Sequence, residues 1–243
     1  MTRLPLALLE KGARVLDQKA SRYLARVRRL TAGATFEVFD PATGLEADAK
    51  IVAVRSASEV TIELGESRAA RKVAERVVRL VQCVGKGNKL DAVVRDATEL
   101  GVTHIQPAIS QRTVKEAGAS QRARLERVAL DASRQCGRSD VPRVDEPCGL
   151  EDALRASEAT HKLCLHPRAR ASFRQELASI AATDSIDLVI GPEGGFTDGE
   201  LQLAEALGYR LVRLGVWTMR TETAATAALG ALLVSASPDV TAE

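Results

Sequence analysis

The spacing of hydrophobic residues divides this chain of 243 residues into two parts with different patterns. In the first part, residues 17–30 have helical spacing, and Gly33 is expected to end that helix. Alternation of apolar and polar residues then predicts strands over 35–39, 45–54 and 59–64. The first part is therefore expected to be a small β-rich unit, followed by a polar linker over 65–75.

After the linker, short apolar runs alternate with segments of helical spacing. Strands are predicted over 77–83, 104–109, 162–165, 187–190 and 210–214. Helices are predicted over 90–100 and 122–136, and from near residues 171, 198 and 222. Strands that alternate with helices indicate an α/β fold with a mostly parallel sheet covered on both faces. The predicted domains are residues 1–70 and 71–243.

The composition excludes several protein classes. Hydrophobic residues make up 45% and charged residues 27% of the chain, which is typical of a folded domain. The longest uncharged apolar run, 223–234, is shorter than the roughly 20 residues that a membrane-spanning helix needs. No secretory leader is expected from the first residues. The four cysteines have no C-x-x-C spacing, so we expect no metal site, no disulfide scaffold and a cytoplasmic location.

The charge is unevenly distributed, although the net charge is only +2. Residues 11–30 contain seven basic residues and one acid, and residues 112–138 contain seven basic residues and three acids. From residue 181 onward, three arginines face nine acids. Basic clusters of this kind can neutralise the phosphates of a polyanion. The alternative is that each cluster is the solvated face of a helix.

The most informative segment lies between the predicted strand at 187–190 and the helix from 198. It contains the loop Gly191-Pro192-Glu193-Gly194-Gly195, at the carboxyl end of a strand, where α/β sheets bind ligands. Its glycines allow the backbone to approach a ligand closely. It matches neither G-x-G-x-x-G nor a P-loop, so neither a dinucleotide nor a triphosphate site is indicated. The alternative is an ordinary strand-to-helix turn.

A second strand ends at Leu214-Gly215, and its loop leads into an alanine-rich helix over 224–234. Small residues on nearly all sides of a helix indicate close approach to a second chain or to a threaded loop; the alternative is a buried core helix. Arg220 and Glu222 lie beside the start of that helix. Cys136, in Gln135-Cys136-Gly137-Arg138, has no recognisable Cys–His context, so thiol catalysis is rejected.

Together these segments resemble the bacterial 16S ribosomal RNA uridine-N3 methyltransferase family of the trefoil-knotted SPOUT superfamily. The resemblance covers most of residues 77–235, and the N-terminal unit is similar to the small PUA-like β-barrel of that family. The matching pieces follow the order of the family: Thr98–Val102, Gln135–Arg138, Ile190–Phe196, Leu214-Gly215 and Arg220–Ala224.

The resemblance implies a homodimeric, cytoplasmic enzyme that uses S-adenosylmethionine to methylate one uridine of small-subunit rRNA, either free or in the assembled subunit. It implies that Arg220 stabilises the uridine anion or anchors a phosphate, and that Glu222 is a base or organises Arg220. The implied cofactor-binding residues are Gly191, Glu193, Gly195, Leu214, Gly215, Met219 and Thr221. The candidate RNA contacts are Arg22, Arg26, Arg28, Arg29, Lys86, Arg112, Arg134 and Arg138.

The chain also departs from the family. Residues 216–219 are Val-Trp-Thr-Met, where the family favours Pro-Arg-Ile-Leu, and this changes one wall of the cofactor pocket. Arg22-Tyr23 replaces two histidines, and Asp96 and Arg134 replace a lysine and an acidic residue. Two alternatives stay open: a knotted methyltransferase with another RNA target, and an RNA-binding module that has lost catalysis. A nicotinamide enzyme is a distant third, because G-x-G-x-x-G is missing.

Overall fold

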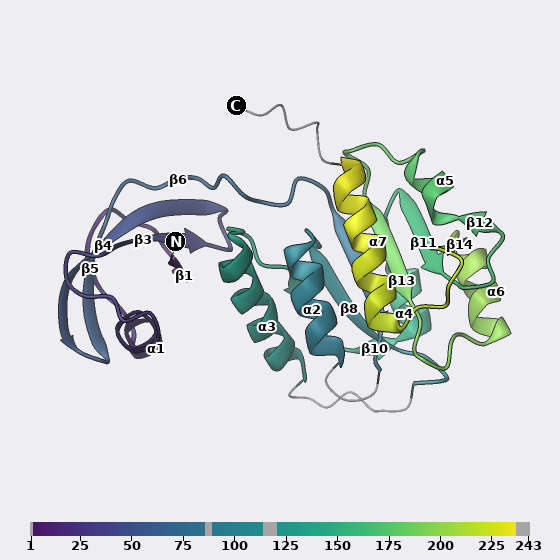
Figure 1. Cartoon of the computed structure of the whole chain (residues 1–243), viewed down its shortest axis with the longest axis horizontal. Coiled ribbons are helices and arrows are strands. Elements are labelled where there is room, and N and C mark those ends of the chain that lie inside the picture. Colours follow the sequence, from purple (N-terminus) through teal and green to yellow (C-terminus); the bar gives the residue numbers. More distant parts are fainter. Residues whose placement is uncertain (1, 86–88, 114–120, 237–243) are drawn as a thin grey trace. The chain divides into compact units, whose positions relative to one another are not determined.

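The structure is a computed structural model that describes residues 2–85, 89–113 and 121–236 (Figure 1). Its contacts divide the chain into two compact units. Unit 1 consists of Met1–Val73 with Ser133–Val141, and unit 2 of Ala74–Ala132 with Pro142–Glu243. Each unit has a hydrophobic core of its own and is described separately.

Unit 1 is built on a strongly curved sheet of six strands in the order β1-β3-β4-β5-β2, with β6 paired to β4. All pairs are antiparallel except β1 with β3. Leu24, Val38, Ile51 and Ile62 are fully or almost fully buried in its core. The strands are β1 (Arg3–Pro5), β2 (Gly12–Val15), β3 (Thr35–Asp40), β4 (Leu45–Ser56), β5 (Glu59–Leu64) and β6 (Arg68–Ala69).

The helix predicted over 17–30 is shorter than expected, and it changes from α-helical to π-helical geometry along its length. Asp17 caps α1 (Gln18–Arg22) by accepting a hydrogen bond of 2.7 Å from the backbone N–H of Ala20. A π-helical turn, η1 (Tyr23–Val27), follows, and the chain leaves the helix through Arg29 at φ 54°. The prediction that Gly33 ends the helix is therefore wrong. The left-handed backbone at Arg29 ends it earlier, and the linker region also contains β6.

Unit 2 contains a sheet of eight parallel strands in the order β10-β8-β7-β13-β11-β14-β12, with β9 paired to β8. The five strands predicted from apolar runs are all present. The three others have only two residues each, too few for a periodic pattern. The strands are β7 (Val78–Cys83), β8 (His104–Ile109), β9 (Arg143–Val144), β10 (Cys148–Gly149), β11 (His161–Leu165), β12 (Ala171–Ser172), β13 (Ile186–Ile190) and β14 (Arg210–Arg213).

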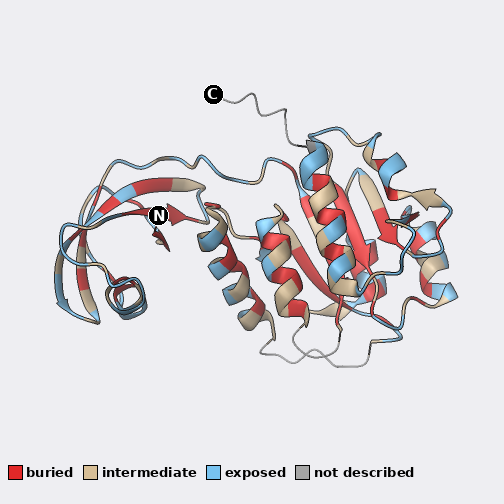
Figure 2. Ribbon diagram, in the orientation of Figure 1, coloured by how far each residue is buried: buried red, intermediate tan, exposed pale blue. Residues whose placement is uncertain are grey.

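Helices cover both faces of this sheet. On one face α2 packs against α7, and on the other α4 contacts β7, β8 and α6 (Figure 1). Figure 2 shows these central strands largely buried and the outer sides of α2 and α7 exposed. The helices of the unit are α2 (Lys89–Glu99), α3 (Gln121–Cys136, whose last four residues group with unit 1), α4 (Leu150–Arg155), α5 (Phe173–Leu177), α6 (Asp198–Ala206) and α7 (Thr221–Ala236).

The expected α/β class and parallel sheet are confirmed. The trefoil knot concerns how the chain is threaded, and it stays a prediction. Within residues 2–85, 89–113 and 121–236, no helix is long and apolar enough to cross a membrane. Over the same ranges, no three His, Cys, Asp or Glu side chains come together in a way that would hold a metal ion.

Candidate active site

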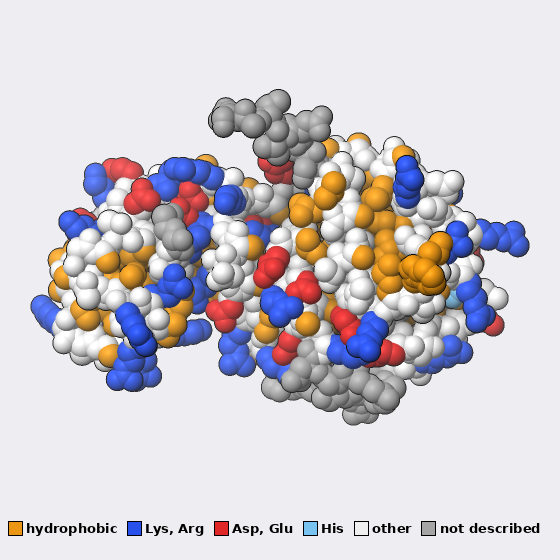
Figure 3. All heavy atoms as spheres, viewed as in Figure 1, with side chains coloured by type: hydrophobic (Ala, Val, Ile, Leu, Met, Phe, Trp, Pro, Cys, Tyr) orange, Lys and Arg blue, Asp and Glu red, His pale blue; other side chains and the backbone are white. Residues whose placement is uncertain are grey.

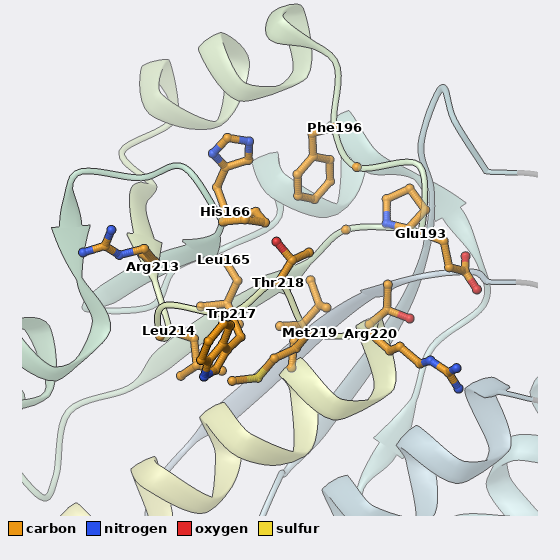
Figure 4. A pocket seen from close by; sticks show the side chains of 18 residues that line it. Leu165, His166, Glu193, Phe196, Arg213, Leu214, Trp217, Thr218, Met219 and Arg220 are labelled. Atoms are coloured by element: carbon orange, nitrogen blue, oxygen red, sulfur yellow. The ribbon is translucent and has the colours of Figure 1, made fainter.

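Three loops of unit 2 meet around one cavity of about 370 Å³. The loops follow β11, β13 and β14, which are neighbours in the sheet, so their carboxyl ends lie side by side. The first loop contributes Leu165–Pro167 to the lining, and the second contributes Ile190–Phe196 except Gly194. The third contributes Arg213–Ala224 except Val216, Glu222 and Thr223. The two glycine-bearing loops singled out in the sequence are thus brought together, and a third loop joins them (Figure 4).

The loop after β13 is shaped by two of its glycines. A Cβ at Gly191 would lie 2.9 Å from Cε2 of Phe196, so only glycine allows this ring to fold back over the strand end. Phe196 is 7% exposed and belongs to the core beneath the cavity. Gly195 adopts φ 70°, and its N–H closes a turn by donating to the carbonyl of Pro192 at 2.9 Å. The loop therefore offers the cavity mainly backbone and the Phe196 ring, together with the one charged side chain of Glu193.

Contacts from outside hold the same loop in place. Arg112 donates from Nη1 to the carbonyls of Gly194 (3.0 Å) and Phe196 (3.3 Å). Glu200 completes a capping box with Thr197 at the start of α6, and it also accepts a 2.8 Å hydrogen bond from the N–H of Gln111. These hydrogen bonds tie the loop to the segment after β8 and to α6.

The loop after β14 forms the opposite wall and exposes apolar surface. Val216 and Trp217 are each 80% exposed, and Trp217 lines the cavity together with Thr218 and Met219 (Figure 4). A Cβ placed on Gly215 would lie 3.7 Å from the methyl carbon of Met219, so the two residues pack closely. Figure 3 shows hydrophobic side chains gathered over this part of unit 2. Three of the four residues in the segment 216–219, which departs from the family pattern, are thus part of the wall.

One end of the cavity is charged. Lys89, at the start of α2, lies 2.8 Å from Oε1 of Glu193 and 3.7 Å from Oε1 of Glu222. The pKa of Glu222 is lowered by its own backbone N–H, by the Thr221 hydroxyl and by the charges of Lys89 and Arg220, so Glu222 is a carboxylate at neutral pH. The hydrogen bond to Glu193 raises the pKa of Lys89. Figure 4 shows Arg220 and Glu193 directed toward this same end.

Neither His166 nor the buried thiol of Cys83 is activated for nucleophilic catalysis. Burial lowers the pKa of His166, which lines the cavity, so it is neutral at pH 7. Burial raises the pKa of Cys83 to about 12, and that thiol is therefore not a nucleophile at pH 7.

The implied cofactor-binding residues all line the cavity: Gly191, Glu193, Gly195, Leu214, Gly215, Met219 and Thr221. Of the two implied catalytic residues, Arg220 lines the cavity. Glu222 does not line it, but its carboxylate lies 3.7 Å from Lys89 at the charged end. Sequence reasoning missed Lys89, His166 and Phe196. His166-Pro167 directly follows an apolar run, which was a usable signal, whereas nothing in the spacing connected Lys89 with residues 193 and 222.

The candidate RNA contacts occupy different environments. Arg22, Arg26, Arg28 and Arg29 are exposed in unit 1, and Arg112 braces the loop after β13. Arg134 stacks on the ring of Tyr23 at 3.6 Å, within unit 1. The side chain of Arg138 is 10% exposed and ion-paired with Asp140, which leaves little of it for a phosphate. Lys86 lies outside the described residues.

Comparison with known proteins identifies the family. Residues 73–233 match the RNA methyltransferase domain family, and residues 16–65 match the RNA methyltransferase PUA domain family. The ribosomal RNA small subunit methyltransferase E of Synechocystis is 30% identical over 210 residues, which cover 85% of this chain and 68% of that protein.

Two solved structures share the whole fold. The Neisseria gonorrhoeae ribosomal RNA small subunit methyltransferase E, bound to S-adenosylmethionine, has a TM-score of 0.87 and 29% identity over 96% of this chain and 97% of that one. A Legionella pneumophila protein with bound cofactor SAM has a TM-score of 0.86 and 27% identity over 96% of both chains. The resemblance seen in the sequence is confirmed, and this chain belongs to the ribosomal RNA small subunit methyltransferase E family, with an RNA methyltransferase domain and a PUA domain.

Proposed function

We propose that this protein transfers a methyl group from S-adenosylmethionine to N3 of one uridine in 16S rRNA. The observation that carries the proposal is the convergence of the loops after β11, β13 and β14 on a cavity of about 370 Å³ with one charged end. This volume is within the range of roughly 300–1,000 Å³ that ligand sites occupy.

The residues of the cavity fit such a cofactor. Backbone groups of Gly191, Gly195 and Gly215 can contact an adenine edge at close range, and Leu165, Phe196 and Leu214 offer it apolar walls. The replaced segment, residues 216–219, still contributes a tryptophan, a threonine and a methionine to the lining. When bound, S-adenosylmethionine supplies an electrophilic methyl carbon on a sulfonium.

The charged end provides what the uridine needs. N3 must lose its proton before or during methyl transfer, so a cation near the base is required to stabilise the resulting anion. Arg220 supplies that cation. A carboxylate with a lowered pKa is a weak base, so we assign Glu222 no role as the base. Instead it helps to hold Lys89 and Arg220 at the charged end.

The wider assembly follows from the same proposal. Arg22, Arg26, Arg28 and Arg29 would contact the RNA backbone from the PUA-like domain, for which we keep the predicted range 1–70. A second copy of the chain would cover the exposed apolar residues Val216, Trp217, Leu233 and Val234. The proposed setting is the cytoplasm, with small-subunit rRNA or the assembled subunit as substrate.

The test is methylation of unmodified 16S rRNA and of unmodified small subunits by the purified protein, read by mass mapping of nuclease fragments. A methyl group at one uridine N3 is expected; a methyl group at another position favours a relative with a different target. No binding of S-adenosylmethionine in calorimetry favours a module without catalysis.

Arg220→Ala tests the assigned role within the same assay. Removal of a donor that stabilises transition-state charge costs roughly 10²–10³ in rate, so a fall of this size is expected. Arg220→Lys, which keeps the charge, is the matched control. A wild-type rate in Arg220→Ala, with cofactor affinity unchanged, would remove Arg220 from the site.

A further inference from the structure

A second cavity of about 750 Å³ adjoins the cofactor cavity, and His166 lines both. The loop of residues 166–170, between β11 and β12, lies at this junction. Leu165 of β11 and Ala171 of β12 are both register partners of Val212, one on each side of β14. The loop therefore crosses over the carboxyl end of β14, next to Arg213.

This loop is held by backbone hydrogen bonds and carries charged side chains at its surface. The N–H of His166 donates to the carbonyl of Val212 at 2.9 Å, and the N–H of the buried Ala169 donates to the carbonyl of His166 at 3.1 Å. Arg168 and Arg170 flank Ala169 and are exposed. The guanidinium groups of these two residues and of Arg213 form no hydrogen bond or ion pair with any residue in the described ranges, so they are available to a ligand.

The two ends of the cofactor cavity differ in charge. At the end near α2, two cations, Lys89 and Arg220, face the two carboxylates of Glu193 and Glu222, so the charges balance. At the end near β12 and β14, Arg168 and Arg170 line the second cavity and Arg213 lines the first, and Figure 4 shows Arg213 directed outward. Arg210 is held by Glu176 at 2.9 Å, and Glu205 is the carboxylate in the second cavity's lining.

A nucleotide whose base enters the cofactor cavity must leave its phosphates at the mouth, and a phosphate favours uncompensated arginines, whose guanidinium can bind it with two hydrogen bonds. We propose that Arg168, Arg170 and Arg213 form a phosphate-binding subsite that holds the RNA backbone next to the target uridine. This inference rests on the proposed function and adds an RNA contact that the basic clusters of the sequence did not indicate.

The test is the double variant Arg168→Glu/Arg170→Glu. The matched control is Arg143→Glu/Arg155→Glu, which changes the net charge equally at two exposed arginines of unit 2, on β9 and at the end of α4. Those arginines lose only surface ion pairs with Asp145 and Glu151. Affinity for unmodified 16S rRNA and for small subunits is measured at several salt concentrations, and affinity for S-adenosylmethionine by calorimetry.

The double variant is expected to bind RNA at least about tenfold more weakly, with the slope of log affinity against log salt smaller by about 1.4, the value for two lost phosphate contacts on a single strand. Its cofactor affinity and the salt slope of the control are expected to be unchanged. If the glutamates prevent folding, Arg168→Gln/Arg170→Gln should reduce the slope by the same amount.

Equal RNA binding by the double variant and the control would overturn the subsite. Loss of cofactor affinity with RNA affinity unchanged would also overturn it, because the arginines would then bind the cofactor's carboxylate. A wild-type protein that neither binds nor methylates RNA would instead contradict the proposed function, which makes the two failures distinguishable.

Discussion

Gly191→Ala is the sharpest test of how the cofactor cavity is shaped. The added methyl carbon would lie 2.9, 3.1 and 3.2 Å from three ring carbons of Phe196, and the first distance is shorter than real Cβ contacts allow. The ring is 7% exposed and packed in the core, so it cannot swing into solvent without losing that burial. Overpacking of this kind costs typically 1–3 kcal/mol.

Because each 1.4 kcal/mol is a factor of ten, we expect S-adenosylmethionine to bind Gly191→Ala roughly 5–150-fold more weakly if the loop absorbs the strain. Calorimetry measures this affinity. Thermal unfolding measures how much of the overpacking free energy lowers the stability of the variant instead of its cofactor affinity. Gly199→Ala is the control, since a Cβ there meets nothing within 4 Å and φ is not positive.

A second substitution decides whether the clash is the cause. Phe196→Leu removes the ring edge that the new methyl group meets, so it should recover part of the affinity lost in Gly191→Ala. A coupling energy of about 0.5–3 kcal/mol is expected from a double-mutant cycle on two residues in contact. Additive effects, or wild-type affinity and stability in Gly191→Ala alone, would refute the assignment of Phe196 as the wall that glycine accommodates.

Two further predictions concern the sheet and the loop after β14. Asp187, fully buried in β13, accepts hydrogen bonds from Arg79 (2.7 Å) and the Tyr209 hydroxyl (2.6 Å). Asp187→Ala should lower the free energy of unfolding by roughly 3–5 kcal/mol in urea denaturation, because it leaves a buried charge unpaired; a loss below about 1 kcal/mol would contradict this role. Trp217 is the single tryptophan and lines the cavity at 80% exposure, so S-adenosylmethionine should shift its emission to the blue, and an unchanged spectrum at saturation would place the cofactor elsewhere.

The periodic pattern determined the long elements of this protein. The β5 and β8 strands begin and end where they were predicted, and in β5 all six residues follow one alternating pattern. The glycine-bearing loops were also visible, since glycine is needed where backbone passes a ring or turns at positive φ. Short elements such as β6, β9, β10 and β12 have two residues each and leave no period to detect.

Only the tertiary structure decided which of these pieces act together. Lys89 and residues 193 and 222 are far apart in sequence, and they meet because α2 packs against α7 beside β13. Arg138 looked like one more member of a basic cluster, but the fold buries it against Asp140. Nothing in the sequence singled out Arg168 and Arg170. They lie at the carboxyl end of β14 because β14 pairs with β11 on one side and β12 on the other, and their loop connects those two strands. Local sequence fixes backbone preference, whereas proximity between distant side chains depends on strand order, which the sequence pattern does not encode.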